Sequence, residues 1–270
     1  MAIDRVRELM SAEPILGQRV ASGRWYVATE GCKEFVVEGG SSAELLIYDV
    51  LTAEAGVVDI KLEQGVSLRI VHVVNNAGSK SKINMHLADN ATCRMTEVIV
   101  VAAEEELTVN LNAQGANFEH SGLFILTDEE RGSVDVNVRH NAPDCTSHTS
   151  MRGVASGKAR GSFKGLVYVA PDAQRTDSVQ SSRNIVIGEA HIATEPQLEI
   201  YADDVKCSHG ATVGQMDADA ILYMRQRGLS LADAKRLQIE GFVSDVVLHS
   251  SVEVLVDALQ EILSEKFNNL

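Results

Sequence analysis

Residues 57–74 read VVDIKLEQGVSLRIVHVV, and their alternation of side-chain types decides the fold of this chain. Val58, Ile60 and Leu62 are separated by single charged residues, and after Gly65 the apolar residues Val66, Leu68 and Ile70 again alternate with polar ones. Successive side chains of a strand point to opposite faces, so this alternation predicts strands with one buried face. The stretch therefore predicts two successive strands joined by a tight turn.

The same pattern repeats along the chain. Alternating segments recur at intervals of 25, 24 and 27 residues, centred on Ile60, Met85, Val109 and Val136. Largely apolar runs recur between them, at 71–74, 98–101 and 123–126. Two interleaved strand series are expected where each repeat forms one coil of a parallel β-helix. A β-sandwich would show Asn-Gly or Asp-Gly hairpins, and a doubly wound sheet would show helices between its strands. We therefore predict an all-β core, a right-handed parallel β-helix, over residues 17–214.

Helical periodicity is found at both ends of the chain. A short helix ended by Pro14 is predicted within an N-terminal arm, residues 1–16. A C-terminal α-helical subdomain is predicted for residues 215–270, where it would cover bare strand edges. Its three helices are expected to begin at Asp217, at the capping box Ser230-x-x-Asp233 and at the capping box Ser250-x-x-Glu253. The first is expected to stop at Gly228, and the second to run through Leu237 toward Gly241.

Four glycines spaced four residues apart, at 153, 157, 161 and 165, predict tight corners in the later coils. The alternative, a phosphate-binding loop, lacks both a Gly-Lys-Ser/Thr ending and a GxGxxG motif that opens a helix.

The composition restricts the classes of partner. Asp and Glu total 38 against 24 Lys and Arg, a formal net charge of −14, and such acidity repels nucleic acid. The sequence contains no run of 18 apolar residues, so we predict no membrane-spanning helix. The opening MAIDRVRELMSAEP lacks the apolar region of a signal peptide, and four scattered cysteines suit a reducing compartment. We therefore expect a cytoplasmic protein that binds neither nucleic acid nor membrane.

A thiol and an imidazole stand two residues apart at Cys207 and His209. On a strand these side chains project to the same face, where sulfur and nitrogen could hold a soft or borderline metal. Tetrahedral centres need three or four ligands, so the pair is half a ligand set. The alternative is a buried thiol beside a hydrogen-bonded surface histidine. A second Cys–His spacing is found at Cys145-x-x-His148, with His140 nearby. The surrounding residues predict a loop, and the spacing is expected by chance in this chain unless the fold brings it near Cys207.

The sequence gives weaker support for an enzymatic function than for a metal-binding pair. Asp203 and Asp204 resemble the acidic pair of a carbohydrate-active β-helix enzyme, but adjacent strand residues face opposite sides. Ser208 lies directly beside His209, which is a poor arrangement for a nucleophile and its base. We expect a protein that is not an enzyme.

Two long segments carry a family resemblance. ADDVKCSHGATVGQMD (residues 202–217) and ILYMRQRGLSLADAKRLQIEGF (residues 221–242) resemble the C-terminal signature of the SufB/SufD family, in its SufD-like form. Family members are scaffold subunits of the SUF iron–sulfur cluster assembly machinery. The resemblance implies the same β-helix fold. It is convincing over residues 140–242. Family members usually carry a long N-terminal helical region, where this sequence has only the short segment before Pro14.

The resemblance also gives a reason for half a ligand set. Two family subunits pair through the ends of their β-helices, and a transient iron–sulfur cluster is thought to form where they meet. The family's SufD-type histidine and cysteine fall on His209 and Cys207, while residues 208–212 depart from the Glu-His-Glu-Ala-Thr run of SufB. The implied partner is a SufB-like subunit or a second copy of this chain, and the sequence is compatible with either. The sequence also does not determine which type of iron–sulfur cluster is built or whether a flavin binds.

The C-terminal helices resemble the surface that the family presents to SufC, an ABC-type ATPase. The residues expected there are Tyr223, Arg225, Arg227 and Leu229. The chain has no Walker motif, so nucleotide hydrolysis would come from that partner. A competing hypothesis is a purely structural recruitment subunit, in which neither Cys207 nor His209 contacts metal.

Overall fold

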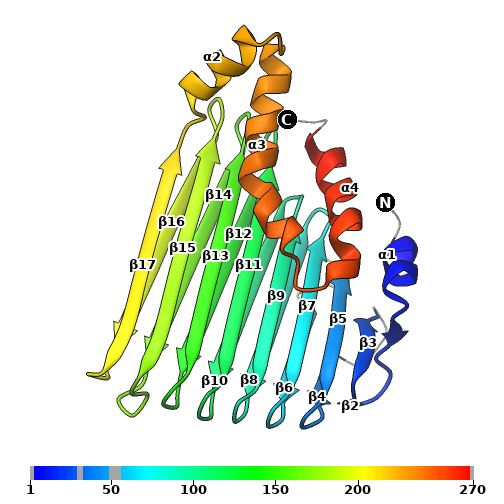
Figure 1. Ribbon diagram of the computed structural model, residues 1–270, viewed down its shortest axis with the longest axis vertical. Helices are drawn as coiled ribbons and strands as arrows, with labels where there is room; N and C mark the ends of the chain where they lie inside the picture. Colours follow the sequence, from blue (N-terminus) through cyan, green and yellow to red (C-terminus); the bar gives the residue numbers. More distant parts are fainter. Residues whose placement is uncertain (1–2, 29–32, 49–55, 268–270) are drawn as a thin grey trace.

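The computed structural model describes residues 3–28, 33–48 and 56–267, and it consists mainly of two parallel sheets (Figure 1). Every strand pairs with the strand two places along the chain, so consecutive strands alternate between the sheets. This is the topology of a parallel β-helix followed by helices, as predicted. The nine-stranded sheet contains β1 Glu13–Pro14, β3 Gly23–Val27, β5 Ser42–Tyr48, β7 Ser67–Val74, β9 Thr92–Ile99, β11 Asn117–Leu126, β13 Thr146–Ala155, β15 Thr176–Val186 and β17 Val205–Gly214. The eight-stranded sheet contains β2 Arg19–Val20, β4 Glu34–Val37, β6 Gly56–Leu62, β8 Ser79–Leu87, β10 Ala103–Leu111, β12 Arg131–His140, β14 Arg160–Val169 and β16 His191–Ile200.

The inward side chains of both sheets form one core along most of the axis, and a small separate apolar cluster that contains Val167 and Val169 lies near the last coil. Ile60 stands opposite Met85, and Met85 opposite Val109, as the repeat near 25 residues predicts. The next step is longer, because Val109 stands opposite Val138 and the expected partner Val136 stands opposite Leu107. Extra residues in the turns of that coil lengthen the repeat without changing which strand residues face inward.

The outward face of the nine-stranded sheet is also buried, beneath helices. These are α1 Ile3–Met10, α3 Leu231–Leu248, a short 3₁₀ turn at Glu253–Leu255 and α4 Val256–Phe267, while α2 Ala218–Gln226 extends beyond the strand ends (Figure 1). Outward residues such as Val73, Val98 and Leu123 pack with α3 and α4 in a second core. The apolar runs of β7, β9 and β11 are therefore buried on both faces, which explains why they do not alternate.

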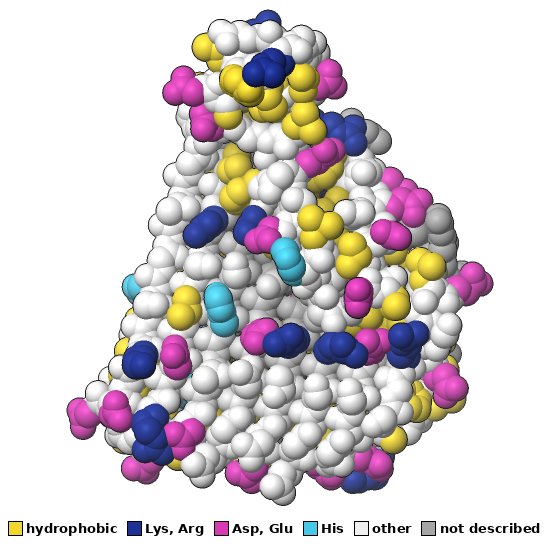
Figure 2. Space-filling model, in the orientation of Figure 1, with side chains coloured by type: hydrophobic (Ala, Val, Ile, Leu, Met, Phe, Trp, Pro, Cys, Tyr) yellow, Lys and Arg dark blue, Asp and Glu magenta, His cyan; other side chains and the backbone are white. Residues whose placement is uncertain are grey.

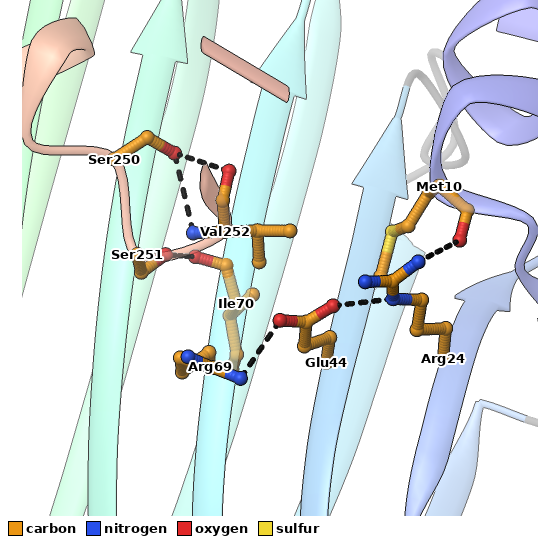
Figure 3. Close-up of polar contacts among 8 residues, drawn as sticks. All are labelled: Met10, Arg24, Glu44, Arg69, Ile70, Ser250, Ser251 and Val252. Atoms are coloured by element: carbon orange, nitrogen blue, oxygen red, sulfur yellow. Dashed lines mark hydrogen bonds and ion pairs between the residues drawn. The ribbon is translucent and has the colours of Figure 1, made fainter. Parts of the chain in front are cut away.

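Polar contacts fix the covering segments to the strands (Figure 3). Ser251 Oγ donates to the Ile70 carbonyl, which ties the turn before α4 to β7. Glu44 pairs with both Arg24 and Arg69 at 2.8 Å, and Arg24 also donates to the Met10 carbonyl at the end of α1. The helices share their core with the sheet, so the division at residues 16 and 214 into arm, β-helix and helical subdomain stays a prediction.

The C-terminal helices differ from the sequence expectations in two places. Helix α3 continues through Gly241 to Leu248, because its inward stripe, including Val243 and Val247, packs on the sheet. The predicted box Ser250-x-x-Glu253 does not form, since Ser250 Oγ is bonded to the main chain of Val252 and no side chain caps the turn that follows. Asp217 and Ser230 cap α2 and α3 as expected.

Three of the four spaced glycines do not mark corners. Only Gly157 lies in a turn, with φ at +68°. Gly153, Gly161 and Gly165 lie inside strands and leave room for large inward side chains. A Cβ on Gly165 would lie 1.9 Å from the amide nitrogen of Gln180. The glycine spacing is therefore a packing feature of the interior.

Within residues 3–28, 33–48 and 56–267, none of the helices combines the length and apolar composition needed to cross a membrane.

Candidate metal-binding end of the solenoid

The solenoid ends at β16 and β17, each of which pairs with a single neighbour. β17 forms the outer edge of the nine-stranded sheet, clear of α3 and α4 (Figure 1). An edge strand presents a row of main-chain donors and acceptors that another chain can pair with. Exposed apolar side chains also lie at this end, namely Val179, Ile200, Tyr201 and Val213. The end has the character of an interface.

Cys207 and His209 lie on β17 and face the axis of the solenoid. Cys207 stands opposite Ser178 and His209 opposite Gln180, and both partners are buried inside the preceding coil. Side chains in register on neighbouring parallel strands point the same way. Cys207 is half-buried against the small apolar cluster that contains Val167 and Ala173, while His209 is exposed. The structure thus places the predicted pair together on one face of the open end.

Burial raises the pKa of the Cys207 thiol, and the nearby Asp177 carboxylate raises it further. The sulfur is therefore protonated at neutral pH, and a metal ion would have to displace that proton. Among the described residues, the one group of three His, Cys, Asp or Glu ligand atoms that converge within 4.8 Å lies elsewhere in the fold. Within this chain the pair offers two ligands.

A polar interior lies directly beneath the pair, and sequence reasoning missed it. Five of the six inward positions of β15 are buried polar residues, namely Thr176, Ser178, Gln180, Ser182 and Asn184, and only the last, Val186, is apolar. Ser178 Oγ hydrogen bonds to Ser147 Oγ at 2.8 Å, and Ser147 Oγ to His140 Nε2 at 2.8 Å. Neither polar atom of the Gln180 amide has a hydrogen-bond partner in the described part of the chain. The signal was present in TDSVQSSRN, where the residues at every second position are polar.

The second Cys–His spacing does not form a site. Cys145 is fully buried, and its thiol donates to the Ala113 carbonyl at 3.2 Å, whereas His148 is exposed on β13. His140 faces inward and bonds to Ser147, and among the described residues its nitrogens do not converge with Cys145 or His148 into a group of three ligand atoms. Asp203 and Asp204 are both exposed in the turn before β17.

The four residues predicted to bind an ATPase are divided by the structure. Tyr223 is 56% exposed, and the Arg227 guanidinium lies 4.9 Å from the centre of its ring, so these two share a surface. Arg225 is exposed two positions from each of them and so faces another side of α2. Leu229 is half-buried beyond the end of α2, and its N–H bonds back to the Met224 carbonyl. Figure 2 shows hydrophobic side chains gathered around a basic one over α2, and α2 itself has no buried residue.

Comparison with known proteins agrees with this architecture. The profile of the family described as SUF system FeS cluster assembly, SufBD core domain, matches residues 26–242. The chain is 35% identical over 163 residues to the iron–sulfur cluster assembly protein SufD of Escherichia coli, which covers 59% of this chain and 38% of that protein. A SufBD family protein of Synechocystis is 29% identical over 210 residues, 74% of this chain and 46% of its own length.

A SufBD family protein of Mycobacterium leprae is 26% identical over 227 residues, 77% of this chain and 57% of that protein. The chain thus spans between 38% and 57% of the length of these three relatives. The profile covers most of the chain, including the end that carries Cys207 and His209. On this basis the chain belongs to the iron–sulfur cluster assembly family defined by the SufBD core domain, and within that family it is SufD-like.

Proposed function

We propose that the chain is a non-enzymatic, cytosolic scaffold subunit of SUF iron–sulfur cluster assembly. Its open end docks against a SufB-like subunit or a second copy of itself, and Cys207 and His209 supply two of the ligands that hold the nascent cluster, which is cargo. One observation carries the proposal: a thiol and an imidazole lie on the same face of β17, an edge strand that pairs only with β15 at the end of the solenoid.

The physical chemistry of that end supports docking. The main-chain N–H and C=O groups on the free edges of the two last strands gain hydrogen-bond partners when another solenoid end pairs with them. The exposed Tyr201, at 60%, and Val213, at 46%, would be removed from water by the same contact. Two ligands from each subunit complete the four-ligand shell that thiolate and imidazole iron–sulfur sites use.

The raised pKa of Cys207 suits a transient site. A thiol that is protonated when empty binds metal only when the ion displaces its proton, so loading depends on both the ion and the partner. We infer that the complete ligand shell exists only in the complex.

A second surface, formed by Tyr223 and Arg227 on α2, is proposed to contact a SufC-type ABC ATPase. An exposed aromatic ring beneath a guanidinium is the kind of anchor that interfaces favour. Replacing either residue by Ala is expected to reduce co-purification with the ATPase. Arg183→Ala, on the exposed face of β15, is the matched control and is expected to leave co-purification unchanged.

The cluster role is tested in the complex of this chain with a SufB-like subunit and a SufC-type ATPase. After anaerobic reconstitution with ferrous iron and sulfide, bound iron, bound sulfide and the visible spectrum are compared for wild type, Cys207→Ser and His209→Ala. We expect each variant to retain the mass of the complex and to lose at least about tenfold in cluster yield.

Ser208→Ala is the matched control, because Ser208 lies on the same strand and points to the opposite face. Wild-type yield in both the Cys207 and His209 variants would contradict the ligand role and leave the purely structural recruitment hypothesis. Loss of the complex itself in every variant would instead assign the two residues to docking alone.

A further inference from the structure

Four ionisable side chains meet inside the solenoid, away from its open end. His72 comes from β7, Glu97 from β9, Glu105 from β10 and His120 from β11. None of them is more than 4% exposed. Three strand spacings separate β11 from β17 in the nine-stranded sheet, so the group lies about 14 Å or more from Cys207 along the axis.

Three of the four side chains are close enough to share one ion. His72 Nδ1 lies 3.0 Å from Glu97 Oε1, and His72 Nε2 lies 3.9 Å from Glu105 Oε2. His72, Glu97 and Glu105 each offer one ligand atom such that all three atoms lie within 4.8 Å of one another. Ligands about 2.1 Å from a tetrahedral ion are about 3.4 Å apart, so a small inward shift would close this group on a metal.

His120 is directed into the same group without satisfying its own nitrogens. Its Nε2 lies 3.3 Å from Glu97 Oε2, yet neither ring nitrogen nor that oxygen makes a well-oriented hydrogen bond in the described part of the chain. Burying such groups unsatisfied is costly. An ion bound to Glu97 would strengthen the alignment of its second oxygen with His120, as outer partners of metal ligands commonly do.

The described residues that stand next to His72 and Glu97 in the nine-stranded sheet are uncharged. In the register of the nine-stranded sheet, His72 and Glu97 lie between Ile47 on one side and Gly122 and Met151 on the other. One divalent cation bound beside Glu97 and Glu105 would offset the cost of burying two carboxyl groups in this core.

We propose that His72, Glu97 and Glu105 bind one divalent first-row transition-metal ion inside the solenoid, with His120 as a positioning residue that orients Glu97. One imidazole nitrogen and two carboxylate oxygens suit Zn²⁺, Fe²⁺ or Mn²⁺. Ca²⁺ and Mg²⁺ prefer oxygen ligands alone, and Cu⁺ prefers thiolates and thioethers. The ion is resident and structural, distinct from the cluster proposed at the open end, and it needs no partner subunit.

The test uses the full chain, unfolded in chelator and refolded with Zn²⁺, with Fe²⁺ under anaerobic conditions, with Mn²⁺ or with Mg²⁺ alone. Bound metal is measured by mass spectrometry after gel filtration, and Co²⁺ serves as a spectroscopic probe of the ligand geometry. We expect one equivalent of a transition metal per chain, none of Mg²⁺, and a midpoint of thermal unfolding that rises with metal concentration.

Glu97→Gln removes one ligand charge at constant shape and is expected to weaken metal binding at least about tenfold. Glu104→Gln is the matched control, since Glu104 is exposed on β10 in an ion pair with Lys80. Cys207→Ser is expected to keep the full equivalent, which separates this site from the open end. Wild-type chain that refolds without metal, and whose stability is the same with and without added ions, would overturn the proposal whether or not Glu97→Gln folds.

Discussion

Acidification is expected to destabilise the protein through one buried histidine, His140. The side chain is 0% exposed on β12, its Nε2 bonds to Ser147 Oγ at 2.8 Å, and its Nδ1 has no hydrogen-bond partner among the described residues. Burial lowers the pKa of His140 from its ordinary value of 6.5 to about 4. The folded protein therefore keeps this ring neutral at pH values where the unfolded chain has already bound a proton.

The direction and size of the effect follow from linkage. The full contribution of the neutral ring is present above about pH 6.5, and it is lost as the pH falls from there to about 4. At about 1.4 kcal/mol for each pKa unit, the loss reaches about 2 kcal/mol at pH 5 and about 3 kcal/mol at pH 4.

The assay is urea unfolding of wild type and of His140→Gln at several pH values between about 7.5 and 4.5. Gln cannot be protonated, so the difference in free energy of unfolding between the two proteins should shift by about 2 kcal/mol toward the variant at pH 5. His148→Gln, an exposed histidine on β13, should follow wild type at every pH. A wild-type minus His140→Gln difference that stays constant with pH would refute the reasoning.

Two further predictions concern packing and capping. Gly153→Ala is expected to destabilise the chain by about 1–3 kcal/mol in urea unfolding, because the new Cβ would lie 2.4 Å from Phe124 Cζ and 2.3 Å from Asn184 Oδ1 in a closed interior. Gly210→Ala on β17 has nothing within 4 Å and should change stability by less than about 0.5 kcal/mol, so equal effects of the two would contradict the packing argument. Asp217→Ala removes a side chain that accepts from two main-chain amides at the start of α2, at a cost of about 1 kcal/mol. Because α2 buries no residue, the loss should appear as faster amide hydrogen exchange within α2, with exchange in β7 to β13 unchanged. Slower or unchanged exchange in α2 would count against the cap.

Sequence reasoning recovered the fold because its cause is local. The alternation at Val58, Ile60 and Leu62 reflects strand geometry, and the repeat near 25 residues reflects coil length, so both are visible in the linear chain. The same local chemistry identified Asp217 as a helix cap. The glycine spacing was misread, because a glycine that makes room for Phe124 or Gln180 has no local signature that separates it from a turn glycine.

The sequence by itself determined that this chain winds strands into a parallel β-helix and that a thiol and an imidazole share one face of a late strand. Only the tertiary structure decided that this strand is the open edge, that polar side chains line the coil beneath it, and that His72, Glu97, Glu105 and His120 meet in the core. The physical reason is the length of the coils. Each turn adds or omits a few residues, and the register that results determines which distant side chains stand opposite one another.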